Sequence, residues 1–71
     1  MAGQFDPRRE LLQVLLEKVS DDHHPSVTMM DMIEGMLTPD EVEAYAEVLL
    51  DKVRDETYPS IDMMRRLRAL A

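Results

Sequence analysis

The stretch VLLEKVSD at residues 14–21 returns as VLLDKVRD at residues 48–55, and this repetition governs the interpretation of the whole chain. When residues 11–37 are laid over residues 45–71, an offset of 34 without a gap, 10 of 27 positions are identical. A Pro-Ser pair and a Met-Met pair repeat along with the apolar stretch. We interpret the pattern as a duplicated unit of a long helix, a proline-containing loop and a short helix.

The two long helices are predicted from caps and apolar spacing. The first is expected to begin with Asp6 as N-cap and Pro7 at the first helical position. The third is expected to begin in TPDE at residues 38–41, which is a capping box with proline after its threonine. Apolar residues at helical spacing form one arc on each helix. The arcs comprise Leu11, Leu12, Leu15, Leu16 and Val19, with Val14 at the flank, and Val42, Tyr45, Ala46, Leu49, Leu50 and Val53.

The short helices are expected over residues 29–37 and 63–70, with Thr28 and Asp62 as N-caps. Before them, the rings of His24 and Tyr58 occupy equivalent positions and are expected to pack over the ends of the hairpins. The sequence therefore predicts an all-α, four-helix domain over residues 1–71. Two pseudo-symmetric helical hairpins, about 7–37 and 39–71, would cover each other's apolar arcs.

Composition excludes several classes of protein. The chain has 71 residues, 15 acidic and 8 basic side chains, a net charge of -7 and no cysteine. Disulfides and thiolate chemistry are excluded, and no apolar run approaches the roughly 20 residues that cross a bilayer. Because phosphate binding needs a basic surface, nucleic acid is a poor partner. We expect a cytoplasmic protein without a membrane or nucleic-acid partner.

One segment contains metal-ligand residue types. Asp21, Asp22, His23 and His24 are consecutive, and imidazole and carboxylate suit zinc or nickel. Adjacent histidines seldom converge on one ion, and the second repeat has DETY at residues 55–58 instead. We therefore expect no metal and no cofactor. Without a nucleophilic triad or a phosphate-binding glycine loop, we predict no catalytic residue and no enzyme activity.

Acidic residues are concentrated in the middle of the sequence. Nine of them lie between Val19 and Asp51, with no lysine or arginine in that interval. Three of these, Glu43, Glu47 and Asp51, are spaced to form a stripe along one side of the third helix. Two interpretations remain open, a solvated face and a binding surface for a basic protein.

The seven methionines allow two interpretations, a role in the core and a role in a partner-binding groove. Met29 and Met30 are repeated as Met63 and Met64, which favours a role in the core. Met32 aligns with Arg66 instead, so it is the methionine we expect at the surface, where methionine suits an adaptable partner groove.

These features favour a non-enzymatic, acidic helical protein–protein interaction module. Its partner would be a protein, such as a basic one, or a second copy in a homodimer. The candidate partner-binding residues are Glu43, Glu47, Asp51 and Met32. The alternative is a regulatory inhibitor or nucleic-acid mimic whose acidic face binds a basic protein.

Residues 23–50 also show a family resemblance. The segments are HP at residues 24–25, TMMD at 28–31, LTPDEV at 37–42 and AYA at 44–46. They resemble small all-helical proteins of mycobacteria and related actinobacteria that form a family of unknown function. The chain lacks the glycine- and proline-rich turn that those proteins usually have after the first proline. The resemblance implies a helical fold and transfers no catalytic or binding residue.

Overall fold

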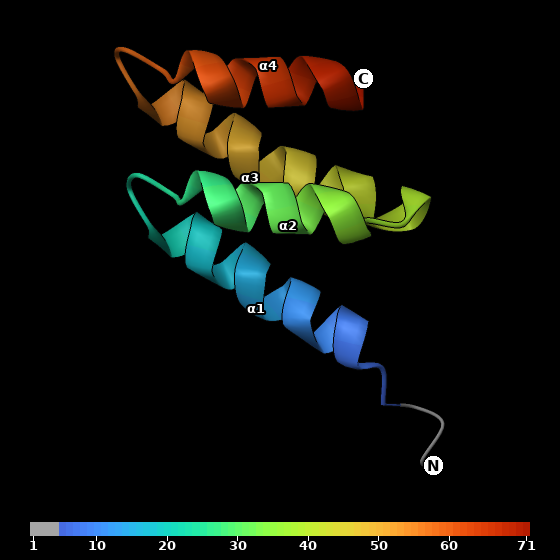
Figure 1. The fold of residues 1–71 in the computed structure, drawn as a ribbon. Helices are drawn as coiled ribbons and strands as arrows, with labels where there is room; N and C mark the ends of the chain where they lie inside the picture. Colours follow the sequence, from blue (N-terminus) through green and yellow to red (C-terminus); the bar gives the residue numbers. More distant parts are fainter. Residues whose placement is uncertain (1–4) are drawn as a thin grey trace. The chain divides into compact units, whose positions relative to one another are not determined.

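The computed structural model describes residues 5–71, which fold into four α-helices (Figure 1). Helix α1 spans Pro7–Asp21 and α2 spans Val27–Met36, while α3 spans Val42–Asp55 and α4 spans Ile61–Leu70. A 3₁₀ turn, η2, spans Pro39–Glu41 immediately before α3. No strand is present in residues 5–71. The predicted all-α class with four helices is confirmed.

The chain divides into two compact units at Leu37. Unit 1 ends at Leu37 and contains α1 packed against α2. Unit 2 begins at Thr38 and contains η2 and α4, both of which pack against α3. Each unit therefore joins a helix of 14 or 15 residues to one of 10 residues.

Helix α1 begins as its capping residues predict, whereas α3 begins later than predicted. Asp6 is the N-cap of α1, its carboxylate accepts a hydrogen bond from the backbone N–H of Arg8 at 3.1 Å, and Pro7 occupies the first helical position. At the start of unit 2, the carboxylate of Glu41 accepts from the N–H of Thr38 at 3.0 Å, as in a capping box. The N–H of Glu41 donates to the carbonyl of Thr38 at 2.9 Å, and this tighter bond makes a 3₁₀ turn. Helix α3 consequently begins one turn later than the capping box alone indicates.

The short helices begin two residues earlier than predicted. Ser26 and Ser60 are their N-caps, and the hydroxyl oxygens accept from the N–H groups of Met29 at 3.3 Å and Met63 at 3.2 Å. The prediction of Thr28 and Asp62 was therefore wrong. Serine, threonine and aspartate are all good N-caps, so local preference alone did not decide which position would cap each helix.

The core of unit 1 is narrower than the predicted apolar arc. Its buried side chains come from both helices and are Leu12, Leu15, Val19, Met30 and Ile33. Leu11, predicted to be inside, is 41% exposed, and the flanking Val14 is 47% exposed. A helix that packs on one neighbour buries a stripe of its surface, so residues at the edge of a wide arc stay in contact with water.

Unit 2 buries Tyr45, Leu49 and Met63. Met64 was expected in the core because it repeats Met30, but it is 36% exposed. Tyr58 is 89% exposed and His24 is also exposed, so the expected packing of their rings was wrong. Both residues precede a proline, which favours an extended backbone at that position.

A long-range hydrogen bond joins the two helices of unit 1. The guanidinium Nη1 of Arg8, near the start of α1, donates to the backbone carbonyl of Met36 at the end of α2, at 2.9 Å. The last carbonyls of a helix have no partner within the helix, and a cation there also interacts favourably with the helix dipole. Arg8 therefore fixes the open end of the hairpin.

Replacing Gly35 by Ala is expected to stabilise the protein by about 0.5 kcal/mol, because alanine restricts the unfolded chain and Gly35 lies in the last turn of a helix. Gly35 lies in α2 without a positive φ, and a Cβ built there meets no atom within 4 Å. Thermal melting of both proteins should show the midpoint of Gly35→Ala several degrees higher. An unchanged or lower midpoint would contradict this account of α2.

Candidate protein-binding surfaces

The side of α3 that contacts water carries a row of carboxylates. Glu43, Glu47 and Asp51 are all exposed, as predicted, and Asp40 and Asp55 extend the row at either end. Residues four apart lie on the same side of a helix, about 6 Å apart along its axis. We call these five residues the acidic face.

The acidic face follows from the amphipathic pattern of α3. Tyr45 and Leu49 are completely buried on the other side of the helix. Burying these two side chains leaves the row of acidic residues in water, because a helical period cannot place both sets inside. The local fold of unit 2 therefore sets the orientation of the acidic side chains.

Within residues 5–71, few interactions neutralise the acidic face. A guanidinium nitrogen of Arg54 lies 3.8 Å from a carboxylate oxygen of Asp51, and both side chains are well exposed. Such an exposed ion pair contributes little free energy. At the other end, the hydroxyl of Thr38 donates to the carboxylate of Asp40 at 2.6 Å. This neutral donor does not cancel the negative charge of Asp40. The face thus presents concentrated negative charge to the solvent.

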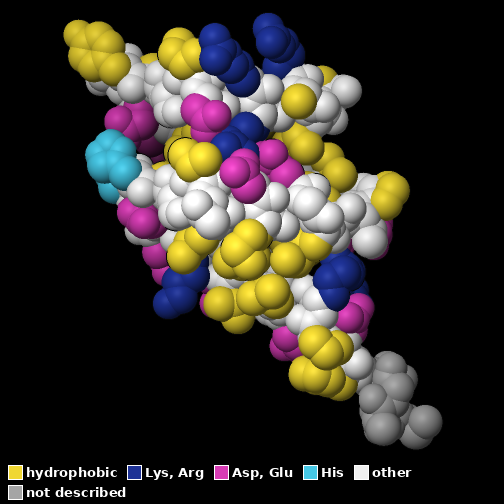
Figure 2. All heavy atoms as spheres, in the orientation of Figure 1, with side chains coloured by type: hydrophobic (Ala, Val, Ile, Leu, Met, Phe, Trp, Pro, Cys, Tyr) yellow, Lys and Arg dark blue, Asp and Glu magenta, His cyan; other side chains and the backbone are white. Residues whose placement is uncertain are grey.

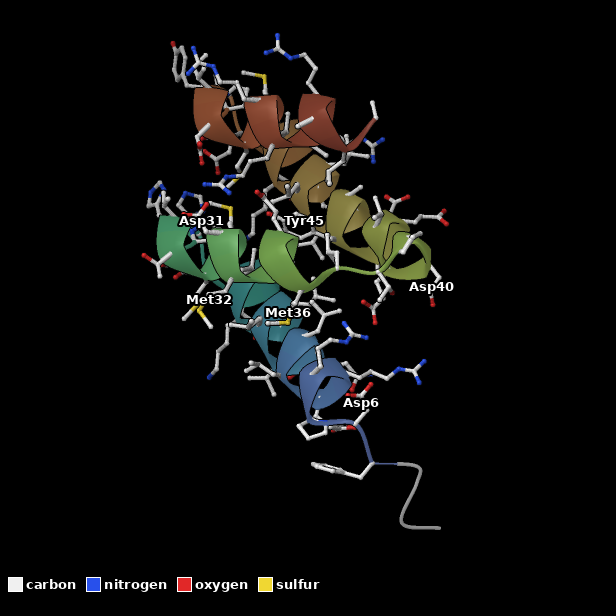
Figure 3. All side chains as sticks on the ribbon, turned by 45° about the vertical axis from the view of Figure 1, so that its right-hand side comes forward. Asp6, Asp31, Met32, Met36, Asp40 and Tyr45 are labelled. Carbon is white, nitrogen blue, oxygen red and sulfur yellow. The ribbon has the colours of Figure 1, made fainter. Side chains whose placement is uncertain are left out.

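A second surface lies along one side of unit 1. Met32 is 45% exposed, as predicted, and Met29 and Met36 are half-buried. Figure 3 shows Met32 and Met36 on the side of α2 toward α1. Leu11 and Val14, on α1, are also exposed apolar side chains, and we call these five residues the methionine face. Hydrophobic side chains also gather over α1 and α2 in Figure 2.

Helix α4 bears a feature that the sequence analysis missed. Ile61, Met64, Arg65 and Arg68 line a shallow hollow of about 260 Å³. Their spacing of i, i+3, i+4 and i+7 was the available signal, since it places them on one side of the helix. This spacing was not used as a signal because Met64 was predicted to lie in the core.

The two histidines interact with each other and not with a cluster of ligands. Their rings meet edge to face, with centroids 4.5 Å apart and an interplanar angle of 71°. The carboxylate of Asp22 accepts from the backbone N–H of His24 at 3.1 Å, which shapes the turn after α1. Across residues 5–71, no three His, Asp or Glu side chains are grouped closely enough to hold a metal ion.

Adding zinc at tens of micromolar is expected to leave the melting temperature unchanged. An ion that binds only the folded state must raise stability by mass action, so a thermal melt is a direct measurement. An upward shift that disappears in the His23→Ala/His24→Ala variant would instead establish a zinc site at these residues.

No helix within residues 5–71 has both the length and the apolar character needed to span a bilayer. No family model matches the chain, and none of the curated proteins or solved structures compared with it is significantly similar. The resemblance to an actinobacterial family over residues 23–50 thus stays a prediction.

Proposed function

We propose that this chain is a non-enzymatic protein–protein interaction module whose acidic face binds a basic protein. The observation that carries the proposal is the exposure of Glu43, Glu47 and Asp51 in one row on α3. Like charges at this spacing repel one another and mildly destabilise a helix. A basic partner would relieve that repulsion, so the negative charge of the free protein favours association with it.

The proposal also includes three expectations from the sequence. The two hairpins would be products of an internal duplication, as their repeated residues indicate. Helices of matching length in the two units, with N-caps at the aligned positions Ser26 and Ser60, support this origin. The protein would act in the cytoplasm, and its relatives would be the small actinobacterial helical proteins that residues 23–50 resemble.

The alternative proposal is a regulatory inhibitor that imitates nucleic acid. Its support is the regular spacing of carboxylates along α3, which offers a basic cleft a repeating row of negative charges. The two functions differ in competition. A mimic occupies the phosphate-binding surface of its partner, so DNA or RNA must displace it, whereas a simple interaction module need not compete with nucleic acid.

Affinity capture from the native host with three baits, the wild type and two variants, tests the proposal. The first variant is Glu47→Lys/Asp51→Lys on the acidic face, and the matched control is Glu17→Lys/Asp21→Lys on α1, which reverses two exposed charges at the same spacing. A partner bound through the acidic face should be retained by the wild type and the control, and lost from the first variant. Equal retention by all three baits would contradict the proposal, and release by added DNA or RNA would favour the mimic.

A further inference from the structure

The methionine face brings together apolar side chains from both helices of unit 1. Leu11 and Val14 lie one turn apart on α1, and Met32 lies between Met29 and Met36 along α2. An exposed apolar patch shared by two packed elements commonly marks an interface. Methionine favours such a role because its unbranched side chain adapts to the shape of a partner.

The charges beside Val14 indicate which partner fits. Glu10 and Lys18 lie four residues before and four residues after Val14, and both are exposed. The three residues form one ridge along α1, because positions four apart are neighbours on a helix surface. From its N-terminal to its C-terminal end, the ridge therefore carries a negative charge, an apolar side chain and a positive charge.

This ridge is complementary to itself when reversed. If two α1 helices pack antiparallel about Val14, each Lys18 lies opposite Glu10 of the other copy. Parallel packing would place like charges opposite each other, which is unfavourable. A two-fold symmetric interface requires a surface that is complementary to itself, and this ridge meets that requirement.

We propose that the methionine face is the contact surface of a homodimer, in which α1 of a second copy packs antiparallel about Val14. Burial of the apolar side chains provides the driving force, and the two Glu10–Lys18 pairs set the orientation. Lys18 would repel a purely basic partner, and Glu10 would repel a purely acidic one. The mixed charges of the ridge therefore favour a second copy over either. The dimer does not depend on the acidic face, whose residues lie on η2 and α3.

Sedimentation equilibrium of the full chain, from low to high micromolar concentration, tests the dimer. Met32→Glu should weaken association by roughly tenfold or more, because it places a carboxylate in an apolar contact. The matched control is Met64→Glu on α4, since Met64 is also a partly exposed methionine on a short helix. It should leave the dissociation constant unchanged. A wild type that is monomeric at high micromolar concentration, or an equal loss in both variants, would overturn the proposal.

A charge exchange tests the antiparallel arrangement. Lys18→Glu alone should weaken the dimer, because the new carboxylate lies opposite Glu10, and Glu10→Lys alone should do the same. The double variant Glu10→Lys/Lys18→Glu restores opposite charges and should return the dissociation constant to near the wild-type value. Unaltered far-UV circular dichroism checks that each variant folds. If the double variant is weaker than either single one, the antiparallel dimer is wrong.

Discussion

Replacing Leu49 by Ala should destabilise the protein by about 2–5 kcal/mol, the usual cost of removing a buried leucine side chain. Leu49 is completely buried in unit 2, so the lost methyl groups leave a cavity that neighbouring side chains fill only in part. Small domains have a total stability of only about 5 kcal/mol or somewhat more. Leu49→Ala should therefore unfold in urea at a much lower midpoint than the wild type.

Two other leucines serve as comparisons. Leu15 is buried in unit 1 at the position that aligns with Leu49, so Leu15→Ala should show a loss of similar size. Leu11 lies one turn earlier on α1 but is 41% exposed, so Leu11→Ala should cost well under half as much. If Leu49→Ala unfolds at the wild-type midpoint, the structure of unit 2 is wrong.

Sequence patterns predicted the long helices because the relevant signals are local. Asp6 and Pro7 determine the start of α1 through contacts within three residues. The acidic face was predictable for the same reason, since a helical period alone decides which side of α3 receives Glu47 when Leu49 is buried. Both features need no knowledge of tertiary packing.

The missed features depend on competition or on tertiary packing. Ser26 and Thr28 are both capping residue types, and local preference alone did not decide between them. The exposure of Leu11 and Met64 depends on how much of each helix is covered, which a repeated residue type does not reveal. Met30 and Met64 occupy aligned positions and still differ in burial, so sequence repetition did not imply equal environments.

Reversing three charges on the acidic face is expected to abolish binding of a basic partner. In the variant Glu43→Lys/Glu47→Lys/Asp51→Lys, the surface that attracts the partner becomes one that repels it. For the wild type, the association rate should fall steeply as salt increases, because charges are screened over about 8–10 Å at ordinary ionic strength. Surface plasmon resonance of the captured partner at several salt concentrations measures both effects.

The fold of this variant should survive, because all three side chains are exposed and their replacement leaves Tyr45 and Leu49 untouched. Only Glu43, in the first turn of α3, contributes through the helix dipole, and its reversal should cost about 0.5 kcal/mol.

Leu49→Ala is the opposite control, since it should lose binding only to the extent that it loses structure. If the triple variant binds the partner with unchanged affinity and unchanged salt dependence, the acidic face serves as a solvated surface. The methionine face would then be the candidate binding surface, and Met32→Glu is the variant that tests it.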